Sequence, residues 1–121
     1  MLQVSDRVYQ RFAVDSRDQF EDRALHFLAG EFPDALAMSG EQGLRRAIRT
    51  GQQRAILIGF ETERSVIKYL VLQHIFGADV DVNPAYPEIT VVLNDKRRDP
   101  EARIDQAIQL ASRRLDAKAG A

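Results

Sequence analysis

Hydrophobic positions recur along the chain at the three- and four-residue spacing of an α-helix. The clearest case is the last segment, in which Ile104, Ala107, Ile108, Ala111 and Leu115 follow the i, i+3, i+4, i+7 and i+11 pattern. Asp99 before Pro100 predicts an N-cap followed by proline at the first helical position, and Glu101 places negative charge in the first turn. We therefore predict a helix from residue 100 to near residue 118 with one face in the core.

Two further amphipathic helices are predicted upstream, besides a short one near residues 5–12. One begins at residue 15 or 16, places Phe20, Ala24, Phe27 and Leu28 on one face, and ends near Gly30 and Pro33. The other begins at Ser39, which forms a capping box with Gln42, and has Leu44, Ala47, Ile48, Gly51, Ala55 and Ile58 on its apolar face. Because glycine within a helix costs about 1 kcal/mol relative to alanine, Gly51 predicts the close approach of another backbone. Gly59 is predicted to end this helix in the left-handed conformation.

A strongly apolar segment lies in the middle of the chain. Eight of the eleven residues from 66 to 76 are apolar, and they surround a helix rather than form a stripe. The β-branched residues Val66, Ile67 and Val71 also permit a strand, but segment length, Thr62 as an N-cap and Gly77 at the end favour a helix. We predict a central, buried helix over about residues 62–76.

The remaining segment contains an acidic, proline-bearing loop from 78 to 87, followed by residues 87–93, whose pattern permits a helix or a strand. Pro87 suits the first position of a helix, so we predict a short one. A chain of 121 residues can bury enough surface to fold without disulfides or metals. The predicted fold is all-α: a single domain over 1–121, ordered from about 5 to 117, with five or six helices. The helices at 39–58 and 100–118 pack on the central one.

Composition narrows the classes of function. The net charge is −1, whereas a general nucleic-acid binder carries a basic excess. The chain has no cysteine, so it contains neither disulfides nor thiolate metal sites. We find no signal peptide, and the apolar run at 66–76 is too short to span a bilayer. These observations predict a cytoplasmic protein that binds neither membrane nor nucleic acid.

Catalytic and metal-binding motifs are lacking. The two histidines, His26 and His74, are not in metal-ligand spacing, and no nucleophile or phosphate-loop motif is found. Asp79-x-Asp81-x-Asn83 is similar to the opening of a calcium loop, but Pro84 and Thr90 occupy the positions that require glycine and glutamate. The simpler interpretation of residues 79–83 is a turn in which Asp and Asn side chains bond to the nearby backbone. We predict no catalytic residue, no cofactor and no metal.

Protein binding is the class that remains best supported. Arginine and tyrosine are frequent in binding hot spots, and acidic loops can recognise partners. The candidates for partner binding are Arg45, Arg46, Arg49, Tyr69, Asp79, Asp81 and Tyr86. The basic helix also permits a helix-turn-helix-like DNA-binding regulator. A solvated face balanced by nearby carboxylates is the alternative explanation of these arginines.

The middle of the chain resembles a known group of short proteins. The resemblance covers roughly residues 15–116 and rests on Phe32-Pro33, residues 40–46, Ile48-Arg49-x-Gly51, residues 62–70, Phe76-Gly77-x-Asp79-x-Asp81 and Tyr86-Pro87. The chain resembles short bacterial helical proteins. Their genes lie beside effector and spike genes of the type VI secretion system and of related polymorphic toxin loci. The chain departs from the pattern at Val71. The resemblance implies a chaperone or adaptor that binds a secreted effector or its carrier, or alternatively an immunity protein that neutralises a toxin.

Overall fold

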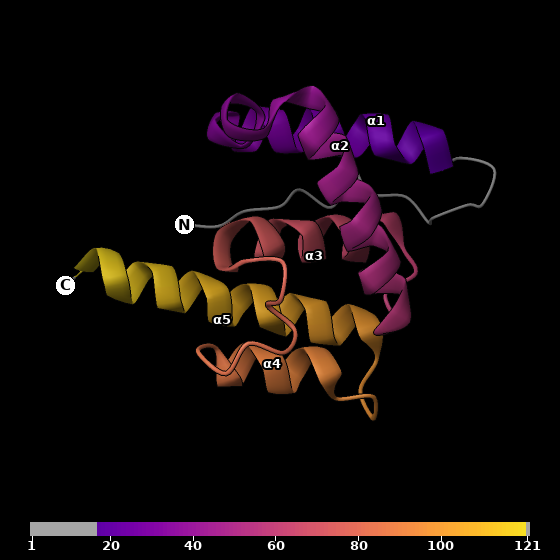
Figure 1. The fold of residues 1–121 in the computed structure, drawn as a ribbon. Helices are drawn as coiled ribbons and strands as arrows, with labels where there is room; N and C mark the ends of the chain where they lie inside the picture. The colour runs from indigo at the N-terminus through magenta and orange to yellow at the C-terminus, as the bar shows by residue number, and fades with distance from the viewer. Residues whose placement is uncertain (1–16, 121) are drawn as a thin grey trace.

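The computed structural model describes residues 17–120, which form five α-helices and no strand (Figure 1). The helices are α1 (Arg17–Glu31), α2 (Pro33–Leu57), α3 (Glu63–Phe76), α4 (Pro87–Asn94) and α5 (Pro100–Gly120). The all-α prediction is confirmed. The helix predicted near residues 5–12 lies outside the described residues, as does the predicted start of α1 at residue 15 or 16.

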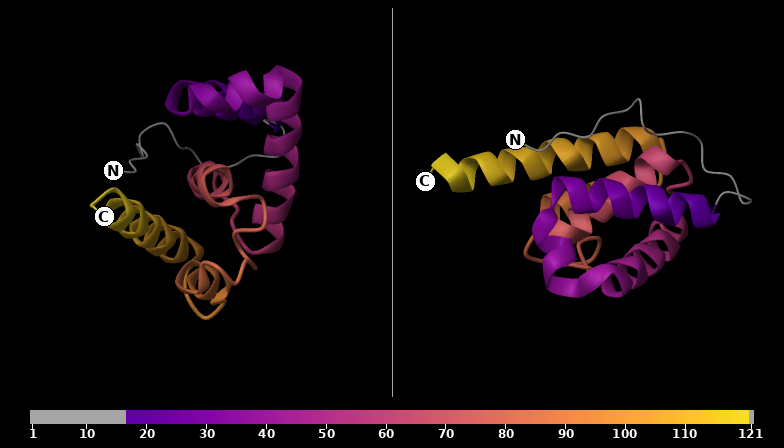
Figure 2. Two further views of the ribbon diagram at one scale, coloured as in Figure 1. Left: turned by 60° about the vertical axis from the view of Figure 1, so that its left-hand side comes forward. Right: turned by 90° about the horizontal axis from the view of Figure 1, so that it is seen from above.

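Helix α3 occupies the centre, as its apolar sequence predicted. The ten consecutive residues from Glu63 to Leu72 are all buried except Arg64, so no side of the helix faces solvent over its first half. Figure 2 shows α3 with α2 along one flank, α5 along another and α1 crossing above. Helix α4 packs on α5. The apolar residues at helical spacing on α1, α2 and α5 therefore face a shared core with α3 at its middle.

Helix α2 begins earlier than predicted and is kinked. Pro33 takes the first helical position directly after α1, and helical structure then continues to Ser39. Gly40 interrupts it with φ 70° and ψ 169°, a conformation that residues with a side chain rarely adopt. The predicted start at Ser39 was therefore wrong, because the capping-box pattern lies at an internal kink. We call residues 33–39 the short piece of α2 and residues 41–57 its long piece.

Two predicted glycine roles can be compared with the structure. A Cβ on Gly51 would meet the side chains of Leu70 and Gln73 on α3. The predicted approach of another backbone is therefore wrong: side chains of α3 fill the space that a Cβ would need. Gly59 has φ 108° and ends α2, as predicted.

The two C-terminal helices follow the predicted caps and faces. Residues 87–94 form a helix rather than a strand: Ile89, Val92 and Leu93 are buried, whereas Val91 is 67% exposed. At α5, the Asp99 carboxylate accepts the backbone N–H of Glu101 at 3.1 Å, as an N-cap does. No helix among the described residues is long and apolar enough to cross a membrane.

Candidate binding groove

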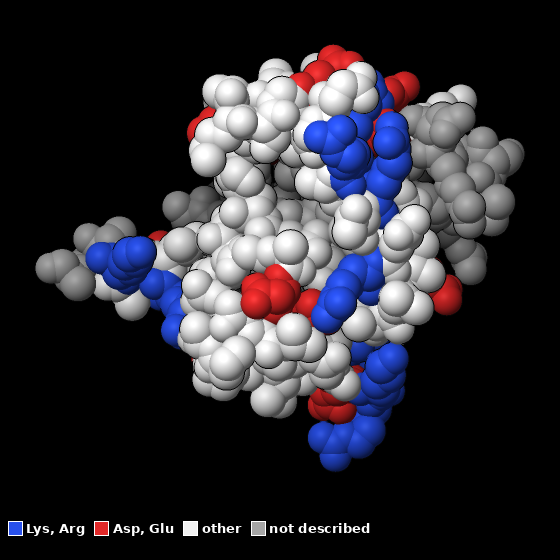
Figure 3. Space-filling view, viewed as in Figure 1, with Lys and Arg blue, Asp and Glu red and all other residues white. Residues whose placement is uncertain are grey.

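A groove of about 640 Å³ opens between the short piece of α2, its long piece and the C-terminal half of α3. Figure 3 shows this face as a hollow of uncharged atoms below the upper part of the molecule, with Lys and Arg atoms beside it. Its lining includes the apolar residues Leu28, Leu44, Ala47, Ile48, Gly51 and Leu70. We call this feature the α2–α3 groove. Its size is within the range of small-ligand and peptide-anchor sites.

The kink in α2 explains why the groove exists. Gly40 turns the long piece away from the short one, so the two pieces form separate walls. Ala47 lies on the apolar face of the long piece but is exposed, because no side chain from another helix covers it. Sequence periodicity predicted this face correctly, yet part of it lines the open groove instead of the closed core.

The short piece presents apolar side chains to solvent. Met38 lines the groove and is 83% exposed, and Leu36 on the same piece is 39% exposed. Methionine is unbranched and polarisable, so it adapts to partners of different shape. An exposed methionine at the edge of an apolar groove is typical of a protein-binding surface.

Two of the predicted binding arginines hold α1 against α2. Arg45 donates to Glu21 and Asp22 at 2.8 Å each, and Arg49 donates to Glu21 at 2.5 Å. The hydrogen bond from Arg49, followed by that from Arg45, lowers the pKa of the Glu21 carboxyl below its ordinary value. The same kind of pairing raises the pKa of Arg45. These two side chains are engaged within the molecule.

Arg46 differs from its neighbours. It is exposed and lines the α2–α3 groove, and within residues 17–120 it makes no ion pair or side-chain hydrogen bond. On the other wall, Asp34 belongs to the short piece and lies 3.6 Å from Nε2 of His74. The groove therefore joins an apolar floor to an uncompensated cation at its edge.

Tyr69 and Asp81 are in the interior. Tyr69 is 0% and Asp81 2% exposed, and the Tyr69 hydroxyl donates to the Asp81 carboxylate at 3.1 Å. Arg54 donates to the same carboxylate at 3.0 Å, so this group ties residues 77–86 to α2 and α3. Burial raises the pKa of Tyr69 above its ordinary value of 10. Neither Tyr69 nor Asp81 can reach a partner in this conformation.

The other two candidates, Asp79 and Tyr86, are not among the residues that line the groove. Asp79 is exposed and accepts a hydrogen bond from Asn83 at 3.3 Å. Tyr86 packs on Phe76, with ring centroids 4.7 Å apart, and under the guanidinium of Arg114. The seven predicted residues therefore do not form one surface, and only Arg46 lines the α2–α3 groove.

The two histidines lie on different helices, His26 on α1 and His74 on α3. His74 stacks on Phe32 with ring centroids 4.5 Å apart, and His26 is exposed on α1. Across residues 17–120 no group of three histidine or carboxylate side chains is arranged to hold a metal ion. In the calcium-like segment, the Asp81 carboxylate is held by Arg54 and Tyr69.

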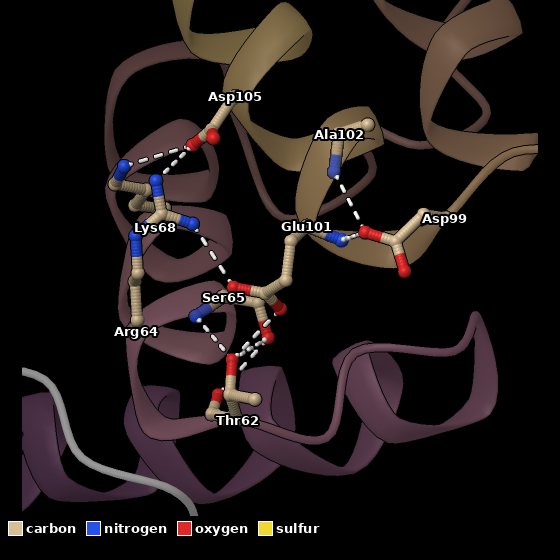
Figure 4. Close-up of polar contacts among 8 residues, drawn as sticks. All are labelled: Thr62, Arg64, Ser65, Lys68, Asp99, Glu101, Ala102 and Asp105. Carbon is tan, nitrogen blue, oxygen red and sulfur yellow. Dashed lines mark hydrogen bonds and ion pairs between the residues drawn. The ribbon is translucent and has the colours of Figure 1, made fainter.

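Sequence reasoning missed an ionic seam between α3 and α5. Figure 4 shows Arg64 and Lys68 of α3 reaching the carboxylates of Glu101 and Asp105 on α5. Arg64 lies 2.9 Å from Glu101, and Lys68 lies 3.0 Å from Asp105. The available signal was the matching four-residue spacing of two cations and two carboxylates. Their pairing became visible only when the two helices were placed side by side.

A buried arginine was also missed. Arg103 is 2% exposed and donates to the backbone carbonyls of Ile58 at 3.1 Å and Leu93 at 2.7 Å, while its guanidinium lies 5.0 Å from the Phe60 ring centroid. Both carbonyls are at helix C-termini, where the helix dipole favours a cation. Its position among the polar residues of α5 gave no signal of burial. Arg103 thus joins the ends of α2 and α4 to α5.

The groove therefore offers a largely uncharged surface, an exposed methionine and the guanidinium of Arg46. Comparison of the chain with protein-family models, curated proteins and solved structures gives no match.

Proposed function

We propose that this chain is a non-catalytic accessory protein, cytoplasmic, that binds a segment of a secreted toxin or effector, or of the carrier that delivers it. The single observation that supports binding best is the α2–α3 groove, with its apolar floor and the exposed side chain of Met38. The nature of the partner comes from the resemblance of residues 15–116 to proteins encoded beside type VI secretion effectors. A chaperone or adaptor role is consistent with both the groove and the resemblance.

The groove suits this role for a physical reason. An effector that is still to be secreted must not expose apolar segments to water. When such a segment binds in an apolar groove, the apolar surfaces of both the segment and the groove are buried. Met38 and Ala47 are exposed in the free chain, so they contribute new apolar burial on binding. Residues on the floor such as Leu44 and Ile48 are already buried in the core and hold its shape.

A DNA-binding role draws less support from the basic helix. Arg45 and Arg49 would have to leave the carboxylates of Glu21 and Asp22 before they could bind phosphate. Phosphate contacts supply most of the affinity of such proteins, so two engaged arginines weaken the case. We therefore favour a protein partner.

The proposal is tested by pull-down of the tagged chain from a native lysate, with mass spectrometry to identify a toxin, effector or carrier partner. Met38→Glu and Ala47→Glu place charge in the groove at exposed positions, and both should reduce co-purification of the partner at least tenfold. Val91→Glu changes an exposed apolar residue on α4, outside the groove, and should leave co-purification unchanged. Retention of the partner by both groove variants would contradict the proposal.

Co-expression separates the two accessory roles. A chaperone or adaptor should raise the level of the toxin and leave its toxicity in place. An immunity protein should suppress toxicity at an equal toxin level. In either case the groove variants should lose the effect while Val91→Glu keeps it, because binding precedes both outcomes.

A further inference from the structure

The charge at the edge of the α2–α3 groove specifies the kind of segment that fits it. We infer that the groove binds an amphipathic helix whose apolar side chains enter the groove and whose flanking carboxylate pairs with Arg46. This inference rests on the proposed function and adds the conformation and the charge of the bound segment.

The helical conformation follows from what the groove can offer a peptide backbone. The floor consists largely of aliphatic side chains from helices whose backbone groups are already paired within α2 and α3. An extended segment would bury backbone N–H and C=O groups there without partners, which is costly. A helix satisfies its own backbone and presents apolar residues at i, i+3, i+4 and i+7. The described residues contain no strand whose edge could pair with an extended segment.

The acidic character follows from the pairing of the arginines on α2. Arg45 and Arg49 have carboxylate partners from α1, whereas Arg46 makes no ion pair or side-chain hydrogen bond within residues 17–120 and lines the groove. A guanidinium binds a carboxylate through two parallel hydrogen bonds, and the surrounding apolar surface reduces screening by water. A carboxylate on the bound helix would therefore meet a cation that is not already neutralised.

The opposite wall carries a carboxylate, that of Asp34, so the acidic position of the segment has to lie on the Arg46 side of the groove. Among the described residues that line the groove, Asp34 is the one carboxylate, and it lies 3.6 Å from Nε2 of His74. A basic side chain at that position of the segment would bring its charge close to Arg46. Like-charge contact at a partly desolvated edge is unfavourable.

Synthetic helical peptides test the inference directly. Three peptides carry leucines at i, i+3, i+4 and i+7 spacing and differ only at one flanking position, which is glutamate, glutamine or lysine. Fluorescence anisotropy measures the Kd of each for the full chain. We expect the glutamate peptide to bind about tenfold more tightly than the lysine peptide, with glutamine between them, and the difference to shrink at high salt.

Variants of the chain then assign the preference to one residue. Arg46→Glu should reverse the order of the glutamate and lysine peptides, and Arg46→Gln should remove the preference. Arg113→Glu makes the same charge change at an exposed position of α5 outside the groove and should preserve the order. Circular dichroism of each variant should show unchanged helix content, because Arg46 supports no contact within the described fold.

The possible results separate the inference from the proposed function. Equal affinity for all three peptides, with no response to Arg46→Glu, would overturn the charge assignment and leave apolar binding in place. Failure of every peptide to bind would overturn the helical assignment. The proposed function is judged independently, by the loss of partner from Met38→Glu and Ala47→Glu.

Discussion

Gly51 is the residue whose size most clearly sets the distance between two helices. The apolar face of the long piece of α2 meets α3 there, and a Cβ would collide with the ends of the Leu70 and Gln73 side chains. Gln73 also donates to the Ala78 carbonyl at 3.0 Å, so its displacement would disturb the start of the next loop. Alanine at residue 51 would raise helix propensity, but its Cβ would clash with the side chains of α3.

Gly51→Ala should lower the free energy of unfolding by roughly 1 kcal/mol. The overpacking cost of about 1–3 kcal/mol exceeds the gain of about 1 kcal/mol in helix propensity. Gly30→Ala is the matched control, because Gly30 lies in α1 with nothing within 4 Å of an added Cβ. That variant should be neutral or more stable by up to about 1 kcal/mol. Urea denaturation measures both, and equal signs for the two variants would refute the packing argument.

At the scale of the elements, the contact of α1 with α2 depends on carboxylates. Glu21 receives hydrogen bonds from Arg49 and Arg45, and these lower the pKa of its carboxyl below the ordinary value of 4.5. The unfolded chain therefore takes up this proton at a higher pH than the folded chain does. The stabilisation from Glu21 is fully present at neutral pH and is lost as pH falls below about 4.5 through the folded pKa.

Glu21→Gln should accordingly be less stable than the wild type at pH 7, by roughly 1 kcal/mol for a linked group of ion pairs. The gap should narrow at acid pH, as pH falls through the lowered pKa of the wild-type carboxyl, because that carboxyl then becomes protonated too. Glu61→Gln changes an exposed carboxylate and should differ from the wild type by less than about 0.5 kcal/mol at either pH. Urea denaturation at several pH values gives these differences. A gap for Glu21→Gln that stays constant with pH would contradict the assignment.

At the scale of the molecule, α3 links the two parts of the fold. Helices α1 and α2 pack on one side of it, and α5, which carries α4, packs on another (Figure 2). The ionic seam to α5 and the Tyr69–Asp81–Arg54 group both include residues of α3. Loss of packing at α3 should therefore affect the whole described fold.

Leu72→Ala tests this role. Leu72 is fully buried, so its truncation should lower the free energy of unfolding by about 2–5 kcal/mol. Leu57→Ala removes the same atoms from a side chain that is 76% exposed at the end of α2, and should cost less than about 0.5 kcal/mol. Thermal and urea unfolding measure both. Similar losses for the two variants would show that burial at α3 does not dominate stability.

Much of the secondary structure could be predicted from the sequence, because helix signals are local. The Asp99–Pro100 cap, the Thr62 cap and the apolar spacing on α5 depend on residues within a few positions of one another. The short α4 was also predicted, since Pro87 outweighed the strand-like run that follows it. The start of α2 was not, because a proline start at residue 33 and a capping box at residue 39 are both valid local signals.

The sequence by itself determined which residues form helices and which face of each is apolar, because backbone capping and side-chain periodicity are set by near neighbours. Only the tertiary structure decided which charges are neutralised: Arg45 and Arg49 meet carboxylates from another helix, while Arg46, between them, does not. It also placed Tyr69 and Asp81 in the interior and left Ala47 open to solvent. Those outcomes depend on how separate helices are oriented around α3, and the kink at Gly40 is what turns an apolar face into a groove.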